Sequence, residues 1–400
     1  MEMKLSEQFE ALYHAEPEGV AFCPYRVCPV GAHVDHQLGK VTGFALDKGI
    51  RIAYRPKHNG VIELRSRNFS KRAQFHVREV PEEKENDWAD YLRGATLLLG
   101  RRHPLQVGLA GVIEGSLPIG GLSSSAAVIL SFLEALCRVN QLHLTPAEYI
   151  EIAQAAENQY VGVACGKLDQ SCEVLCQEGR LLYLDTRDGQ YELVPPGAGM
   201  APFRLAILFS GLERTLIGTK YNMRVDECRA AAYALKGYAG MEYGKFAETC
   251  LREVPPEVFA QYGDRLPKPW RQRAEHWYRE EERVEQAVAA WRRGDLREFG
   301  RISFASGRST IDNWETGCPE MKRLYEIMAE TDGVLGGRFS GAGFKGCCLA
   351  IIEPDAADAV EERVTREYLA AFPELTGRFS VHICDTASGI AHPGAGEATA

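Results

Sequence analysis

The segment Leu117 to Val128 (LPIGGLSSSAAV) restricts the fold most, because it places two glycines and three serines directly before an apolar helical run. The apolar residues 107–113 precede it and predict a strand. A glycine-rich turn lets a phosphate approach the backbone, and the free amides and dipole of a helix N-terminus favour negative charge. A helix that is merely capped by Ser123 is the ordinary alternative. The segment alone supports both interpretations equally.

Strand and helix signals alternate along the rest of the chain and indicate an α+β fold. Thr145, Pro146 and Glu148 combine a capping-box spacing with proline at the first helical position, so a second helix is expected there. The other expected strands are 20–30, 50–54, 61–64, 181–184, 347–352 and 379–383, and the other expected helical regions are 219–328 and the segment from Pro354. Residues 188–202 are rich in glycine and proline, which predicts a boundary between domains 1–195 and 196–400.

The composition excludes several classes of protein. The chain has 400 residues, 45% of them hydrophobic and 25% charged, as in ordinary globular proteins. Its 46 basic and 55 acidic residues give a net charge of −9, which disfavours a nucleic acid or a membrane surface as the main partner. The first residues contain no apolar signal core, and the twelve cysteines form no CxxC pair. We therefore expect a cytoplasmic protein with reduced thiols.

Two glycine patterns bear on nucleotide binding. None of the Gly-Lys pairs is followed by serine or threonine, so the chain has no Walker-type phosphate loop. Residues 341–346 (GAGFKG) match GxGxxG, but they lead into a strand, whereas a dinucleotide fingerprint follows a strand and opens a helix. We interpret 341–346 as a tight loop that packs close to another backbone or to a bound phosphate.

The residues His33, Asp35 and His36 put three possible metal ligands within four positions. A zinc or iron hydrolase must therefore be considered. No second cluster with ligand spacing supports that hypothesis, and Gly31 and Gly39 indicate a polar loop after a strand. The loop either binds a substrate or simply satisfies its own hydrogen bonds.

Two carboxylates, Glu157 and Asp169, flank a loop that contains Gly162 and Gly166. Such a pair is suited to serve as a metal ligand and a proton acceptor. Surface carboxylates at this separation are common, so the pair by itself also fits an ordinary polar surface.

Three segments in this order resemble the motifs of the GHMP small-molecule kinases. Residues 25–36 (YRVCPVGAHVDH) are similar to the signature GRVNLIGEHTDY of the galactokinase branch, 118–126 (PIGGLSSSA) to PxGxGLSSSA, and 337–347 (GRFSGAGFKGC) to GARMTGAGFGGC. Weaker matches lie at 88–94, 165–170 and 220–224. The resemblance covers most of the chain. It implies a two-lobed α+β fold with a ribosomal-S5-like N-terminal lobe and a ferredoxin-like C-terminal lobe.

The resemblance also implies a role for each matching residue. Asp169 would be the base that faces the anomeric hydroxyl, Arg26 the cation beside it, and Ser125 and Glu157 the magnesium ligands. The implied sugar site consists of Ala32, His33, Asp35, His36, Gly166, Tyr221 and Lys345, and the implied nucleotide site of Trp88, Pro118, Gly120, Gly121, Leu122, Ser123, Ser124 and Ser125. The implied cofactors are ATP and Mg²⁺, and the implied protein is a monomer or a weak dimer.

The chain departs from the galactokinase pattern where the sugar should bind. Ala32 stands where galactokinases carry glutamate, His36 replaces tyrosine and Lys345 replaces glycine. The family's glutamate contacts the C6 hydroxyl of the sugar, so its loss removes a negative charge and admits a carboxylate at C6. His36 and Lys345 are the candidate counter-charges. Residues 23–37 and 338–350 also resemble the plant galacturonate kinases.

The resemblance therefore predicts ATP- and magnesium-dependent phosphorylation of D-galacturonate at its anomeric oxygen. A galactokinase is the nearest alternative. A non-catalytic sensor of sugar and nucleotide is a more distant one, and Arg26, Glu157 and Asp169 argue against it because a binding protein needs no base and metal ligand together.

Overall fold

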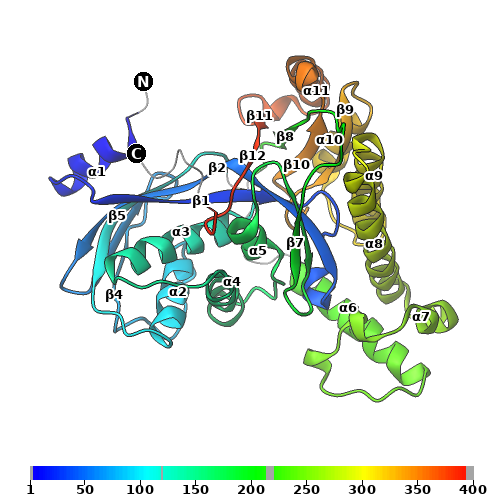
Figure 1. The fold of residues 1–400 in the computed structure, drawn as a ribbon, viewed down its shortest axis with the longest axis horizontal. Helices are drawn as coiled ribbons and strands as arrows, with labels where there is room; N and C mark the ends of the chain where they lie inside the picture. The colour runs from blue at the N-terminus through cyan, green and yellow to red at the C-terminus, as the bar shows by residue number, and fades with distance from the viewer. Residues whose placement is uncertain (1–2, 119, 213–219, 393–400) are drawn as a thin grey trace.

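The structure is a computed structural model that describes residues 3–118, 120–212 and 220–392. These residues form two lobes, each built on one β-sheet (Figure 1). Ile119 of the glycine-rich segment, Thr219 at the expected helix start and residues 393–400 of the tail lie outside the described residues.

The helices and strands of the N-terminal half are α1 (Leu5–Tyr13), β1 (Gly19–Val27), the 3₁₀ turn η1 (Asp35–Gln37), β2 (Lys40–Lys57), β3 (Val61–Ser66), β4 (Ala73–His76), α2 (Asp90–Gly100), β5 (Gly108–Gly115), α3 (Ser124–Val139), α4 (Pro146–Ala155), the π-helical turn η2 (Ala156–Val161), α5 (Leu168–Leu175), β6 (Leu181–Asp185) and β7 (Tyr191–Val194). Those of the C-terminal half are β8 (Arg204–Phe209), α6 (Tyr221–Tyr238), α7 (Pro256–Tyr262), α8 (Lys268–Arg292), α9 (Leu296–Asp312), α10 (Pro319–Ala329), β9 (Val334–Phe339), β10 (Cys347–Ile352), α11 (Ala357–Ala371), β11 (Ser380–Cys384) and β12 (Thr386–Ala387).

The N-terminal sheet is organised around β2, which has 18 residues. The strand order is β4-β3-β5-β2-β6-β7, and β1 and β12 also pair with β2. Helices α2 to α5 lie together below this sheet in Figure 1. Strand β1 runs antiparallel to β2 with Arg26 opposite Ala45. This pairing places Arg26 at the end of β1, where the polar loop begins.

Both predicted helix starts are confirmed. Helix α3 begins at Ser124, and Ser123 precedes it in the left-handed region with φ 57°. At α4, the Thr145 side chain accepts a hydrogen bond from the Glu148 amide, and Pro146 is the first helical residue. A capping box and an N-terminal proline need only local contacts, so the sequence is sufficient to locate them.

The C-terminal sheet is antiparallel with the order β11-β8-β10-β9. This order, with helices between β8 and β9 and α11 between β10 and β11, is the split βαβ arrangement of a ferredoxin-like lobe, as predicted. Side chains of β10 alternate between two cores, because successive residues of a strand point to opposite faces. Cys348, Ala350 and Ile352 pack with α10 and α11, whereas Cys347, Leu349 and Ile351 belong to the main core.

The sequence analysis missed five strands, the short β4 and β12 together with β7, β8 and β9. Strand β8 is a short apolar run, and such runs do not distinguish a strand from a buried helix. Strand β9 contains Gly336, whose Cα lies against Gly300 of α9 so closely that an added Cβ would be 2.4 Å from the Gly300 Cα. Glycine here allows close packing but weakens the strand signal. Strand β7 lies within the glycine- and proline-rich connection and pairs with β6.

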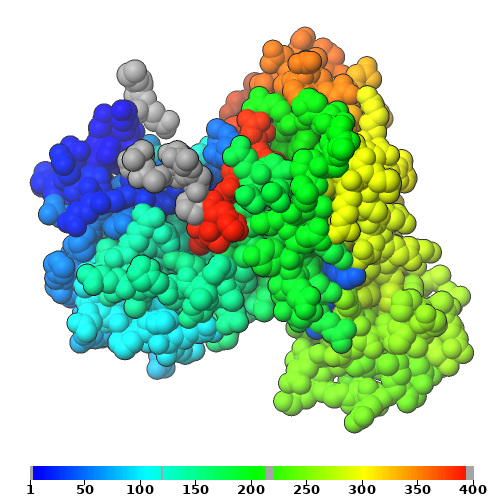
Figure 2. All heavy atoms as spheres, viewed as in Figure 1, coloured from blue at the N-terminus to red at the C-terminus, as the bar shows by residue number. Residues whose placement is uncertain are grey.

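The end of the described chain returns to the N-terminal lobe, as the red segment shows in Figures 1 and 2. β12 pairs with residues 45–46 of β2. Beyond it, the amides of Gly389 and Ile390 donate to carbonyl groups of α5 and its C-cap at 2.8 and 3.0 Å. Residues 386–391 therefore pack on α5, the helix that carries Asp169. The division into two domains at residue 195 stays a prediction.

All twelve cysteines are free thiols, and most are buried. Within the described ranges, no helix is both long and apolar enough to cross a membrane.

Candidate active site

An ion pair between Arg26 of β1 and Asp169 of α5 lies at the centre of the site. The Arg26 Nε donates to Asp169 Oδ1 at 2.7 Å, and Nη2 lies 2.7 Å from the same oxygen. The Ser123 hydroxyl donates to the other oxygen, Oδ2. Burial lowers the pKa of Arg26, but the charge and hydrogen bonds of Asp169 outweigh burial and raise it above its usual value. The pair and the Ser123 hydroxyl therefore hold the Asp169 carboxyl group in a fixed orientation.

Glu157 and Asp35 are two of the buried carboxylates that lie near Asp169. Glu157 lies on the π-helical turn η2 and accepts hydrogen bonds from Ser125, Cys165 and Gln170. Burial, and then the charge of Asp169, raises the pKa of Glu157 to about 7. Asp35 accepts a hydrogen bond from the Leu168 amide at 3.2 Å, and the same two causes raise its pKa to about 6. Gathered carboxylates of this kind attract a cation or a proton.

The glycine-rich segment packs against the second glycine loop. Gly121 has φ +84°, and an added Cβ would lie 3.0 Å from the Ser340 carbonyl oxygen. A Cβ on Gly346 would lie 2.8 Å from the carbonyl carbon of Gly120. The interpretation of 341–346 as a tight loop that packs on another backbone is therefore confirmed. In addition, Arg26 Nη1 donates to the Gly121 carbonyl at 3.3 Å, which ties the loop to the central ion pair.

Two adjoining cavities open beside these groups. The larger, about 330 Å³, is lined by Asp35, His36, Leu38, Gln154, Asn158, Gly162, Ala164, Cys165, Gly166, Lys167, Thr186 and Arg229. The smaller, about 90 Å³, is lined by Arg26, Cys28, Ala32, His33, Asp35, Gly121, Ser123, Ser125, Glu157, Val163, Cys165, Leu168, Asp169, Tyr221, Phe339, Gly341 and Ala342. Asp35 and Cys165 belong to both, so the two cavities are neighbours.

The structure thus brings together most of the residues that the sequence nominated. Arg26, Ala32, His33, Gly121, Ser123, Ser125, Glu157, Asp169 and Tyr221 line the smaller cavity, His36 and Gly166 the larger, and Asp35 both. Pro118, Gly120, Leu122, Ser124, Trp88 and Lys345 line neither.

Trp88 and Lys345 lie apart from the central group. The Trp88 indole donates to the Lys71 carbonyl at 2.7 Å, and its ring stacks on the exposed Phe69 with centroids 6.1 Å apart. Its role beside an adenine ring stays a prediction. Lys345 is exposed on the loop after β9, and its charge acts on Glu320 of α10.

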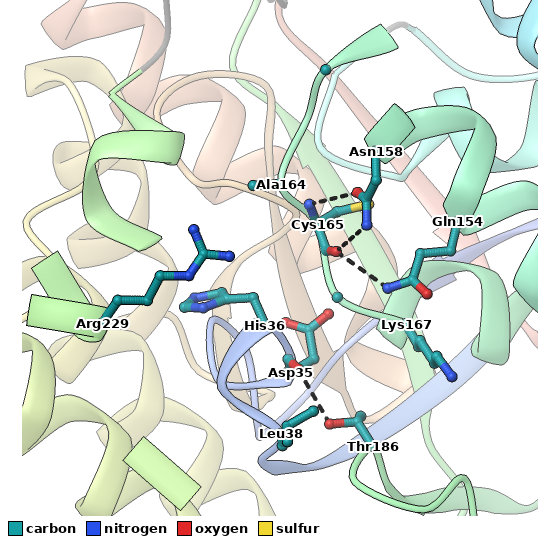
Figure 3. A pocket seen from close by; sticks show the side chains of 12 residues that line it. Asp35, His36, Leu38, Gln154, Asn158, Ala164, Cys165, Lys167, Thr186 and Arg229 are labelled. Atoms are coloured by element: carbon teal, nitrogen blue, oxygen red, sulfur yellow. Dashed lines mark hydrogen bonds between the residues drawn. The ribbon is translucent and has the colours of Figure 1, made fainter. Parts of the chain in front are cut away.

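The sequence analysis did not nominate Arg229, which lies on α6. Figure 3 shows its side chain lying beside the His36 ring, across the larger cavity from Gln154 and Asn158. Burial, and then the charge of Arg229, lowers the pKa of His36 to about 3, so His36 is uncharged at neutral pH. Tyr221 and Arg229 are eight residues apart, and this spacing keeps both near one face of a helix. Because Tyr221 was a predicted sugar-site residue, the spacing was the sequence signal that could have nominated Arg229.

Comparison with known proteins shows to which family a chain with this site belongs. The model of the GHMP kinases N terminal domain matches residues 90–177, the model of the GHMP kinases C terminal domain matches 285–371, and the galactokinase galactose-binding signature matches 7–56. The chain is 38% identical to galacturonokinase of Arabidopsis thaliana, over 92% of this chain and 91% of that protein. It is 32% identical to galactokinase of Homo sapiens, over 90% of each.

Solved structures agree in fold. The galactokinase of Lactococcus lactis, solved with galactose, superimposes with a TM-score of 0.85 and 28% identity, over 96% of this chain and 97% of that one. A mevalonate kinase superimposes with a TM-score of 0.62 at 14% identity and shares the fold alone. The chain therefore belongs to the GHMP kinases. Within them it lies in the galactokinase branch, and it is an ATP-dependent sugar kinase that acts on an anomeric hydroxyl.

Proposed function

We propose that this kinase phosphorylates D-galacturonate and forms galacturonate 1-phosphate and ADP. The observation that carries the proposal is that the smaller cavity is lined by a small side chain, Ala32, and the adjoining larger cavity by a cation, Arg229. The 38% identity to the galacturonokinase supports it. Galactose is the second candidate, which the galactokinase signature and the galactokinase relatives favour.

Asp169 would accept the proton of the anomeric hydroxyl. The anomeric oxygen then forms a bond to the γ-phosphorus of ATP, the bond from that phosphorus to the β,γ-bridging oxygen breaks, and ADP leaves. Phosphoryl transfer depends mainly on positioning and on neutralising charge. Arg26 supplies a fixed positive charge at Asp169, and Ser123 orients the second carboxylate oxygen.

Ser125 and Glu157 suit a magnesium ion that also binds ATP. Mg²⁺ usually takes one or two carboxylates together with phosphate oxygens rather than a full protein cage. The described residues contain no group of three His, Cys, Asp or Glu side chains that could hold a metal alone. Glu157 is buried beside Ser125 and therefore fits such a shared site. The ion would neutralise charge on the phosphates.

Replacing Glu157 with glutamine should raise the magnesium concentration needed for half-maximal activity by tenfold or more and also lower kcat, because a neutral amide is a weaker ligand. A titration of activity against MgCl₂ at constant free ATP measures the shift. The replacement Glu178→Gln, on the loop after α5, is the control. An unchanged magnesium titration in the folded Glu157→Gln variant would remove Glu157 from the metal site.

The larger cavity is suited to receive a carboxylate. Arg229 is the cation that Figure 3 shows lying beside His36. Its other partner is Asp226, at 3.1 Å on the same helix and 60% exposed, and exposed pairs of this kind are weak. The guanidinium is therefore available to a bidentate anion such as a uronate. Asp35, Glu157 and Asp169 make the neighbouring cavity acidic, so a counter-charge for the uronate is required.

Replacing Arg229 with methionine should lower kcat/KM for galacturonate by about tenfold to hundredfold. A hydrogen bond to a charged group contributes about 1.5–3 kcal/mol, and about 1.4 kcal/mol corresponds to tenfold. The kcat/KM for galactose should change less than threefold, because galactose carries no charge at C6. Lys167→Met, which removes another cation from the same cavity, is the matched control and should not discriminate between the sugars. Equal losses on both sugars in Arg229→Met would contradict the assignment.

The substrate is tested directly by measuring ADP release with galacturonate, galactose and glucuronate. We expect the highest kcat/KM with galacturonate. A higher kcat/KM with galactose would replace this proposal by a galactokinase, and the absence of ADP release with all three would support a non-catalytic sensor. We propose that the enzyme acts as a monomer or a weak dimer.

A further inference from the structure

The loop that carries Ala32 and His33 has an unfavourable backbone conformation. His33 has φ 64°, in the left-handed region that side chains other than glycine rarely adopt, and Gly31 has φ 100°. The His33 ring is buried and stacks on Trp314 with centroids 4.9 Å apart and planes 6° apart. Its Nε2 has no hydrogen-bond partner among the described residues, although the ring lines the smaller cavity. Such strain persists only where surrounding groups enforce it.

His276 of α8 is the group best placed to enforce the conformation of this loop. Its Nε2 lies 3.0 Å from the carbonyl oxygen of Ala32, and its Nδ1 lies 2.9 Å from the Ser309 hydroxyl of α9. A carbonyl oxygen only accepts, so Nε2 carries the proton and donates it to Ala32. Nδ1 then accepts from Ser309, which in turn accepts from Asn313 Nδ2 at 3.3 Å. The Ala32 carbonyl therefore selects the tautomer of His276, and Ser309 satisfies the remaining ring nitrogen.

A second contact from the same helix holds the preceding residue. The Gly31 amide donates to Glu280 Oε1 at 2.7 Å, and Glu280 is fixed by Arg283 at 2.6 Å and by Arg338 at 3.4 Å. His276 and Glu280 are four residues apart, so they lie on one face of α8. Both side chains are fully buried. Helix α8 of the C-terminal half, supported by α9, thus holds the loop of Gly31 and Ala32, which belongs to the N-terminal half, through hydrogen bonds.

We propose that His276 is a positioning residue for sugar binding. By donating from Nε2 to the Ala32 carbonyl, it holds His33 in the strained conformation in which the His33 residue lines the smaller cavity. This inference rests on the proposed sugar site, but not on which sugar occupies it. His276 belongs to the C-terminal lobe and lines neither cavity. According to this inference, it nevertheless determines the affinity for the sugar. Burial lowers the pKa of His276 to about 4, so the neutral tautomer persists through the neutral pH range.

The test compares His276→Leu with His276→Gln, using the better of galactose and galacturonate as substrate. Leucine removes the donor, whereas the glutamine Nε2 can replace the histidine Nε2. We expect His276→Leu to raise KM for the sugar by tenfold or more and KM for ATP by less than twofold. His276→Gln should stay within threefold of the wild type for both. A loss of folded protein would lower the apparent kcat and leave both KM values unchanged, so a selective rise in the sugar KM reports the loop.

Two further variants keep the inference falsifiable. Ser309→Ala removes the group that orients His276, and we expect it to raise KM for the sugar three- to tenfold without changing KM for ATP. Tyr278→Phe removes another buried hydrogen bond of α8, from Tyr278 to the Val254 carbonyl at 2.9 Å, and both KM values should be unchanged. An unchanged sugar KM in His276→Leu and Ser309→Ala would overturn the proposal, as would an equal rise in both KM values.

The variant His33→Leu separates this inference from the proposed function. If His33→Leu leaves sugar KM unchanged, the proposed sugar site itself is wrong, and the inference fails with it. If His33→Leu raises sugar KM and His276→Leu does not, only the positioning role of His276 is refuted. Calorimetric titration of each variant with the sugar alone gives the same comparison without turnover.

Discussion

Asp169→Asn should lower kcat by about two to four orders of magnitude, the usual contribution of general-base assistance. The amide keeps the volume of the carboxylate but cannot accept the proton of the anomeric hydroxyl. It also cannot pair as a charge with Arg26, which at present lies 2.7 Å from Asp169 Oδ1. The loss should appear in kcat rather than in KM, because the group acts in the transition state. Single-turnover ADP formation is the measurement.

Glu173→Gln provides a matched control for Asp169→Asn. Glu173 lies one helical turn later on α5, is fully buried, and neither of its carboxylate oxygens has a hydrogen-bond partner among the described residues. Burial, and then the charge of Asp169, raises the pKa of Glu173 well above its usual value, so an amide resembles its neutral form. This control should keep kcat within threefold. Asp169→Asn activity above about a third of the wild type, in a protein with an unchanged melting temperature, would refute the base assignment.

Ala32→Glu should lower kcat/KM for galacturonate far more than for galactose. The new carboxylate would face the carboxylate of the substrate, and like charges about 4 Å apart repel by about 4 kcal/mol at an effective dielectric constant of 20. That energy corresponds to about a thousandfold. Solvent screening and protonation of one partner reduce it, so the expected loss on galacturonate is about tenfold to hundredfold. Galactose offers a neutral hydroxyl that the new carboxylate can bind.

Ala32→Gln separates charge from crowding in this experiment. Ala32 is only 6% exposed, so any longer side chain disturbs the packing of the loop. Glutamine has the size of glutamate without its charge, and the difference between the two variants reports the electrostatic part. If the glutamate and glutamine variants lose the same activity on both sugars, Ala32 contributes only space, and the charge argument for galacturonate fails.

Local patterns were sufficient for much of the fold. The start of α4 was predicted from Thr145, Pro146 and Glu148, since a capping box depends on contacts within one turn. Strand β10 was predicted over its actual range, Cys347–Ile352, because both of its faces are buried and its apolar run is continuous. Strand β9 was missed because Gly336 and Gly337 give no strand signal. The close approaches that explain them, of Gly300 to Gly336 and of Met328 to Gly337, are tertiary contacts.

The sequence by itself determined the family, through three motifs in a fixed order, and it nominated the Arg26, Glu157 and Asp169 that the fold brings to one cavity. Only the tertiary structure decided which charges face the sugar loop. Lys345 and Arg229 are both cations in the sequence, yet Lys345 lies exposed near Glu320 while Arg229 lies beside His36. The contact of His276 with the Ala32 carbonyl likewise joins residues 244 positions apart. Charge and hydrogen bonding act over a few ångströms in space, and a linear motif records no such distance.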